Sequence, residues 1–153
     1  MAERYLFLQE TIEIVSELFN VVITTINSDY IRTSGTGEYR SEVGKRVENP
    51  NIFRKVIDCE ETIIVNSPSR EKAAIYAPLT VKGKVSGAIG IIAFTEEQKN
   101  SGLFHRHVFV NFANKLSELI ASKIEVLEYA EELRINLNET LAILNSVHDG
   151  VIA

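Results

Sequence analysis

The sequence predicts an α+β fold, in which an antiparallel sheet is flanked by helices at both ends of the chain. Three patterns support it: apolar residues at helical spacing near the N-terminus, β-branched segments joined by short turns in the middle, and a long C-terminal stretch without Gly or Pro. The chain has 153 residues, 45% hydrophobic and 24% charged, which is typical of one globular domain with its own core.

The first two elements are a helix and a hairpin. Residues 2–19 are expected to form an amphipathic helix, because apolar residues such as Leu8 and Ile12 recur at helical spacing. The β-branched run VVITTI (21–26) is typical of a buried strand, and the Asn-Ser-Asp sequence after it is typical of a turn. Residues 21–34 are therefore predicted to form a hairpin.

The middle of the chain supplies the rest of the sheet. A short helix over residues 51–59 follows Asn-Pro, and residues 62–65 read as a third strand. Residues 66–72 are predicted to be an exposed loop. The apolar segments around a Lys-Gly-Lys turn predict a long hairpin over residues 73–94, at the centre of the sheet. Thr95 is expected to be the N-cap of a further helix.

The C-terminal stretch predicts one long helix over residues 103–147, because no Gly or Pro occurs from Leu103 to Asp149. Its apolar residues follow alternating steps of three and four, which is the heptad pattern of a coiled coil and predicts a homodimer through these helices. Two polar seam positions, Lys123 and Thr140, suit a helix that changes its packing during signalling. The predicted dimer and signalling residues are Phe109, Phe112, Leu116, Leu119, Lys123, Val126, Ala130, Leu133, Leu137 and Leu144.

Charge and hydropathy exclude several classes of partner. The net charge is −5, and the longest basic cluster is Gly44-Lys45-Arg46, so this segment is not expected to contact nucleic acid. No apolar run reaches the roughly 20 residues that span a bilayer. Acidic residues interrupt the N-terminal apolar stretch, which a signal peptide does not tolerate. The sequence therefore predicts a cytoplasmic protein that does not contact a membrane.

Motifs for catalysis or metal binding are weak. Cys59 is the single cysteine, which excludes an internal disulfide or a multi-cysteine metal site. His105 and His107 form an H-x-H pair, but residues two apart on a helix point to different sides. No G-x-G-x-x-G or Walker sequence and no local nucleophile motif occurs. We expect no catalytic residues, no metal and no cofactor.

A small-molecule pocket is the more plausible site. Aromatic and polar residues lie on or beside the irregular segments that flank the predicted sheet, as in many ligand pockets. Arg32 or Arg40 would clamp a carboxylate or phosphate. In the alternative reading, Arg32 is a surface residue and the tyrosines pack at the rim of the core. The candidate ligand-binding residues are Arg32, Tyr39, Arg40, Phe53, Asn66 and Tyr76.

Three segments resemble known families. Residues 77–94, with A-P-L before a Lys-Gly-Lys turn and VSGAIGIIAF, resemble the closing hairpin of GAF domains. Residues 35–66, from GTGEYR to TIIVN, resemble the middle of GAF-like sensor domains in bacterial sigma-54-dependent transcriptional regulators. Residues 141–153, LAILNSVHDGVIA, resemble the opening of a PAS domain. The GAF-like resemblance covers about residues 10–100.

The resemblance implies a GAF/PAS-like antiparallel sheet with a long C-terminal signalling helix. It divides the chain into a GAF-like sensor domain (1–100), a signalling helix (103–147) whose first turns pack on the domain, and the truncated start of a PAS domain (148–153). The implied function is to bind an unknown small ligand and to signal through a dimeric helix. The implied output is a downstream PAS domain, an AAA+ ATPase and a DNA-binding domain that activate transcription.

One departure from the family leaves alternatives open. Many of the sensor domains that this chain resembles carry cysteines in the loop that corresponds to residues 66–75. This chain has no cysteine there. A metal or redox role is therefore not carried over. A ligand-free, degenerate GAF domain that only dimerises its parent is one alternative. Another is the sensor of a histidine kinase or of a cyclic-dinucleotide enzyme.

Overall fold

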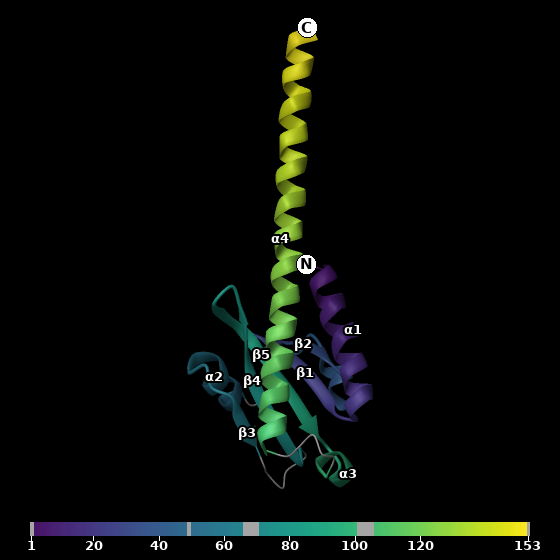
Figure 1. Ribbon diagram of the computed structural model, residues 1–153, viewed down its shortest axis with the longest axis vertical. Coiled ribbons are helices and arrows are strands. Elements are labelled where there is room, and N and C mark those ends of the chain that lie inside the picture. The colour runs from purple at the N-terminus through teal and green to yellow at the C-terminus, as the bar shows by residue number, and fades with distance from the viewer. Residues whose placement is uncertain (1, 49, 66–70, 101–105, 153) are drawn as a thin grey trace.

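The computed structural model describes residues 2–48, 50–65, 71–100 and 106–152. Its centre is a five-stranded antiparallel sheet, which Figure 1 shows beside the long C-terminal helix. The strand order is β2-β1-β5-β4-β3, so the predicted hairpin over 73–94 does lie at the centre. The hairpin over 21–34 and the third strand are also confirmed. The strands are β1 (Val22–Asn27), β2 (Arg32–Gly35), β3 (Ile63–Val65), β4 (Ala73–Val81) and β5 (Lys84–Ala93).

Two helices cover one face of the sheet. Helix α1 (Ala2–Phe19) and the first part of α4 (Arg106–Ile152) contact each other and pack on this face. The edge of the Phe19 ring meets the Phe112 ring, with the two ring centroids 4.9 Å apart. Ile89 and Ile91 of β5 point into this core. Side chains alternate along a strand, and Ala88 and Ile92 therefore belong to the core on the other face.

The other face is covered by shorter elements. These are the 3₁₀ helix η1 (Gly37–Glu42), the segment of residues 43–48 and helix α2 (Asn51–Asp58). The sequence predicted α2 but not η1, which has few turns and buries no residue. Helix α3 (Glu96–Lys99) follows β5, and Thr95 caps it as predicted, in a reciprocal capping box with Gln98.

Helix α4 is continuous over 47 residues and projects far beyond the sheet (Figure 1). Its contact with the sheet is made by one face, through residues such as Leu116, Ile120 and Ile124. Two residues of the predicted dimer seam belong to this intramolecular core instead: Leu116 is buried in it and Phe112 packs against it. The apolar stripe of α4 thus packs on the sheet in the first part of the helix and is exposed to solvent further along.

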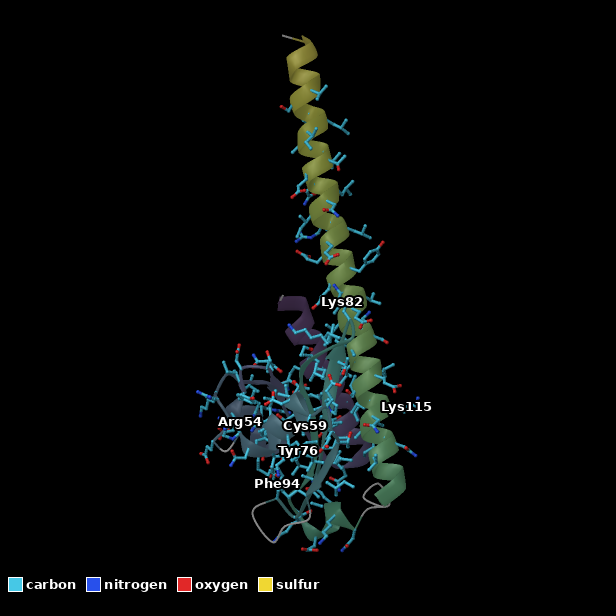
Figure 2. The ribbon with its side chains drawn as sticks, turned by 90° about the vertical axis from the view of Figure 1, so that its left-hand side faces the viewer. Arg54, Cys59, Tyr76, Lys82, Phe94 and Lys115 are labelled. Carbon is cyan, nitrogen blue, oxygen red and sulfur yellow. The ribbon has the colours of Figure 1, made fainter. Side chains whose placement is uncertain are left out.

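The turn between β4 and β5 also holds α4, just past the end of the core. The backbone N–H of Lys82 donates to Glu125 Oε1 (2.5 Å). Its Nζ lies 3.3 Å from Glu128 Oε2 and 3.5 Å from Glu132 Oε1, and these carboxylates raise the pKa of Lys82. Figure 2 shows Lys82 at the hairpin tip beside the helix. Among the described residues, no helix is long and apolar enough to cross a membrane.

Candidate ligand-binding site

A cavity of about 460 Å³ lies on the sheet face opposite α1 and α4. Its floor is formed by β2 and β4, and its walls by η1, the segment of residues 43–48 and α2. Three basic and three acidic side chains surround it together with aromatic rings. The residues that line it are Arg32, Tyr39, Glu42, Lys45, Arg46, Val47, Glu48, Ile52, Phe53, Glu71 and Tyr76.

Arg32 is the buried charge of the cavity. It is only 8% exposed, although it carries a guanidinium group. One Nη donates a hydrogen bond of 2.6 Å to Thr24 Oγ1, and Cζ lies 3.9 Å from the centre of the Tyr39 ring. Among the described residues, no carboxylate forms an ion pair with it. Burial lowers the pKa of Arg32, and nearby groups, Tyr39 foremost, oppose that shift.

Glu71 joins two tyrosine hydroxyls inside the cavity. The Tyr39 hydroxyl donates to Glu71 Oε1, and the Tyr76 hydroxyl donates to Glu71 Oε2 at 2.7 Å. Tyr76 is buried on β4, and burial, reinforced by the negative charge of Glu71, raises its pKa well above the ordinary value. The Tyr76 phenol therefore remains a protonated donor at neutral pH.

The rings are held by their neighbours in the fold. Tyr76 meets Phe53 of α2 edge to face, with ring centroids 5.0 Å apart, and Tyr39 packs against Phe94 at 5.4 Å. Gly90 of β5 lies under Tyr76, where a Cβ atom would come within 2.6 Å of the ring. The absence of a side chain at Gly90 thus lets the Tyr76 ring come close to the backbone of β5. Figure 2 shows Tyr76 and Phe94 on the side of the sheet away from α4.

The structure brings together four of the six predicted ligand-binding residues: Arg32, Tyr39, Phe53 and Tyr76. Arg40 does not line the cavity. Its guanidinium points to α1 and lies 3.2 Å from Glu13 Oε1, with 66% of the side chain exposed. Asn66 lies outside the described residues.

Sequence reasoning missed the polar partner that organises the site. Glu71 falls in the segment predicted to be an exposed loop, and a single Glu there carries no distinguishing signal. The segment of residues 43–48, which supplies Lys45 and Arg46, had no predicted element. An isolated bridge between Ile31 and Arg46 holds this segment beside the sheet.

The predicted seam on α4 is mostly exposed beyond the domain. Leu119 is 66% exposed, whereas Leu116, one turn earlier, is buried against the sheet. The side chains of Lys123 and Ala130 are exposed too. The side chain of Phe109 lies outside the described ones. The remaining seam residues are exposed apolar side chains: Val126, Leu133, Leu137 and Leu144.

The other chemistry-bearing residues do not gather into a site. Within the described ranges, no group of three or more His, Cys, Asp or Glu residues is placed to hold a metal ion. His105 lies outside the described residues, as does the side chain of His107. Cys59 is exposed at the end of α2 and is not among the residues that line the cavity.

Three solved structures share this architecture. The GAF domain of PixJ from Thermosynechococcus elongatus, in its blue-light absorbing form, matches with a TM-score of 0.68 at 12% identity, over 90% of this chain and 94% of that one. The GAF domain of an Acinetobacter phosphoenolpyruvate-protein phosphotransferase gives 0.63 at 14%, over 84% and 86%. The type II free methionine-R-sulfoxide reductase of Thermoplasma acidophilum gives 0.59 at 12%, over 80% and 93%.

Sequence comparison adds one distant relative, whereas no family model matches the chain. The relative is UacR of Escherichia coli K12, whose proposed role is that of a uric acid sigma-54-dependent transcriptional regulator. It is 20% identical over 132 residues, a match that spans 76% of this chain and 22% of the relative. The chain therefore has the α+β fold of GAF domains, and its sequence is distantly similar to part of a sigma-54-dependent regulator.

Proposed function

We propose that this chain is a sensory module that binds a small, planar, anionic ligand in the cavity around Arg32. The observation that carries the proposal is the buried guanidinium, which faces a cavity and has no ion pair among the described residues. A buried charge is costly unless it is paired. The planar fork of an arginine matches carboxylate, phosphate and ring-oxyanion geometries.

The aromatic rings favour a planar ligand. Tyr39, Phe53 and Tyr76 contribute flat surfaces to the cavity, and its volume of about 460 Å³ suits a metabolite-sized molecule. Urate is planar and carries one negative charge at neutral pH. The name of the distant relative UacR refers to uric acid, so urate is the first ligand to test.

The test is isothermal titration calorimetry of the purified chain with urate. Arg32→Lys keeps the charge but removes the fork, and we expect it to weaken binding by on the order of tenfold or more. Arg40→Lys is the matched control, because Arg40 lies outside the cavity and pairs with Glu13. Equal affinity of wild type and Arg32→Lys, with both folded by circular dichroism, would overturn the role of Arg32.

The proposed signal leaves through α4. The helix carries an exposed apolar stripe with heptad spacing, and burial of such a stripe against a second helix is favourable. We propose that two copies of the chain pair along it and that ligand binding shifts the population of two helix packings. The PAS-like residues 141–153 and the similarity to UacR support an output through a PAS domain and a transcription-activating ATPase.

A ligand-free dimerisation module is the second candidate. One observation favours it: Glu71 already accepts hydrogen bonds from both cavity tyrosines, so these polar groups are satisfied without a ligand. This candidate predicts that neither urate nor any other small anion raises the melting temperature in a saturable way. It also predicts that Arg32→Lys leaves the dimer unchanged.

Catalysis is not part of the proposal, although one structural neighbour is a methionine sulfoxide reductase. Reduction of a sulfoxide by a protein thiol needs a cysteine beside the bound substrate. Cys59 is the single cysteine of the chain, and it is exposed outside the cavity. The fold is shared with that enzyme, whereas a thiol in the cavity is not present among the lining residues.

A further inference from the structure

Glu71 occupies the point where two tyrosine hydroxyls of the cavity converge. We infer that Tyr39, Tyr76 and Arg32 form an oxyanion subsite, that the Glu71 carboxylate fills this subsite as an internal competitor, and that a ligand's oxyanion takes its place. The inference rests on the proposed function for the identity of the ligand. The subsite itself is tested separately below.

The donors come from separate elements and meet at one carboxylate. Tyr39 lies on η1 and Tyr76 on β4, yet their hydroxyls donate to the two oxygens of the same group. Hydrogen bonds from a hydroxyl to a carboxylate are among the stronger ones in proteins. Such a set of donors complements an oxyanion with two acceptor oxygens, which is a carboxylate or the equivalent edge of an acidic heterocycle.

Arg32 adds a positive charge to the same subsite. Its Cζ lies 3.9 Å from the ring centre of Tyr39, one of the two donors, and its side chain lines the same cavity. Glu71 and Arg32 interact favourably, since Glu71 is among the groups that oppose the lowering of the arginine pKa. No ion pair joins them in the structure, so the guanidinium retains donors for an incoming anion.

Glu71 is placed so that its side chain can leave without unfolding the sheet. The backbone hydrogen bond from Lys72 N–H to Ala93 O (2.8 Å) fixes the chain directly after Glu71. Glu71 is only half-buried. Rotation about its own side-chain bonds therefore takes the carboxylate into water, where it is well hydrated.

Two carboxylates in one subsite repel each other, so a bound oxyanion and the Glu71 carboxylate exclude one another. Glu71 consequently lowers the affinity for anions and sets the ligand concentration at which the site responds. In the alternative arrangement, Glu71 stays in place and accepts a hydrogen bond from an N–H group of the ligand. The two arrangements predict opposite effects when the Glu71 charge is removed.

The subsite is tested by chemical rescue with acetate. Glu71→Ala vacates the position, and acetate is expected to raise its melting temperature along a saturating curve, at constant ionic strength set with chloride. Wild type is expected to show no saturating rise, and Glu71→Ala combined with Tyr76→Phe is expected to lose most of it. Glu71→Ser, which also shortens the side chain and empties the position, serves as a second variant if Glu71→Ala does not fold. Equal response of wild type and the Glu71 variants to acetate would overturn the inference.

The competition is tested by calorimetry with urate on Glu71→Gln, which keeps an acceptor oxygen but removes the charge. We expect this variant to bind urate on the order of tenfold more tightly than wild type. In the ligand-free variant, the tyrosines no longer donate charge-assisted hydrogen bonds to residue 71, so less interaction energy is lost when urate displaces that side chain. Weaker binding by Glu71→Gln would refute the competitor role. Rescue by acetate without any urate binding would support the subsite and remove urate as its ligand, which separates this inference from the proposed function.

Discussion

Leu137→Ala is expected to weaken the proposed dimer of the chain substantially. Leu137 lies on the heptad seam of α4 beyond the domain and is 59% exposed. Full burial of a leucine contributes roughly 1.5–3 kcal/mol, so burying the remaining surface contributes about 1–2 kcal/mol in each protomer. The side chain occurs twice in a dimer, and its loss is expected to cost roughly 2–4 kcal/mol. Because every 1.4 kcal/mol is about tenfold, the dissociation constant rises by at least tenfold.

The matched control is Ile135→Ala, on the same helix and 46% exposed. Ile135 lies two residues from the seam and therefore on another side of the helix. Both substitutions place a good helix former in α4, so helix propensity does not separate them. Sedimentation equilibrium over a range of protein concentrations measures the dissociation constants. A wild-type chain that stays monomeric at the highest concentration, or an equal loss in both variants, would refute the seam.

Two further predictions concern Tyr76 and Lys82. Burial and Glu71 raise the pKa of the Tyr76 phenol, so the folded state holds this proton more tightly than the unfolded state does. The free energy of unfolding is therefore expected to fall as the pH rises above the unfolded tyrosine pKa of about 10. Urea denaturation at several pH values measures this fall, which is expected to be less steep in Tyr76→Phe. Lys82→Ala removes the ion pairs to α4 and is expected to speed hydrogen exchange of the backbone amides of residues 125–132. Lys84→Ala, at the start of β5, is the control and is expected to leave exchange unchanged; equal effects of the two would exclude a specific role for Lys82.

The sheet and its terminal helices were predictable because their signals are local and repeat along the chain. The β-branched run of β1 and the apolar run of β5 each span a whole strand. It was harder to predict which surface the apolar stripe of α4 packs against. A stripe with a spacing of three and four residues fits both a sheet and a second helix, so Leu116 was assigned to the dimer although it packs inside the chain.

The cavity was predictable only in part, because its members meet through tertiary structure. Arg32 and Tyr76 lie on strands, where alternation points them to the cavity face. Arg40 lies on the unpredicted 3₁₀ helix, whose short turns direct its side chain toward α1. Glu71 comes within reach of Tyr39, 32 residues earlier in the sequence, and no local pattern encodes that contact.

Strand β4 is shared by the two halves of the molecule. Tyr76 faces the cavity, while its neighbours Ile75 and Ala77 are fully buried in the core that contains α4. A substitution on this strand therefore alters both the cavity floor and the surface on which α4 packs. The walls made by η1 and by residues 43–48 are not part of the core that contains α4. We expect natural variants of this domain to change ligand preference through those walls, and to keep β4 nearly constant in side-chain volume.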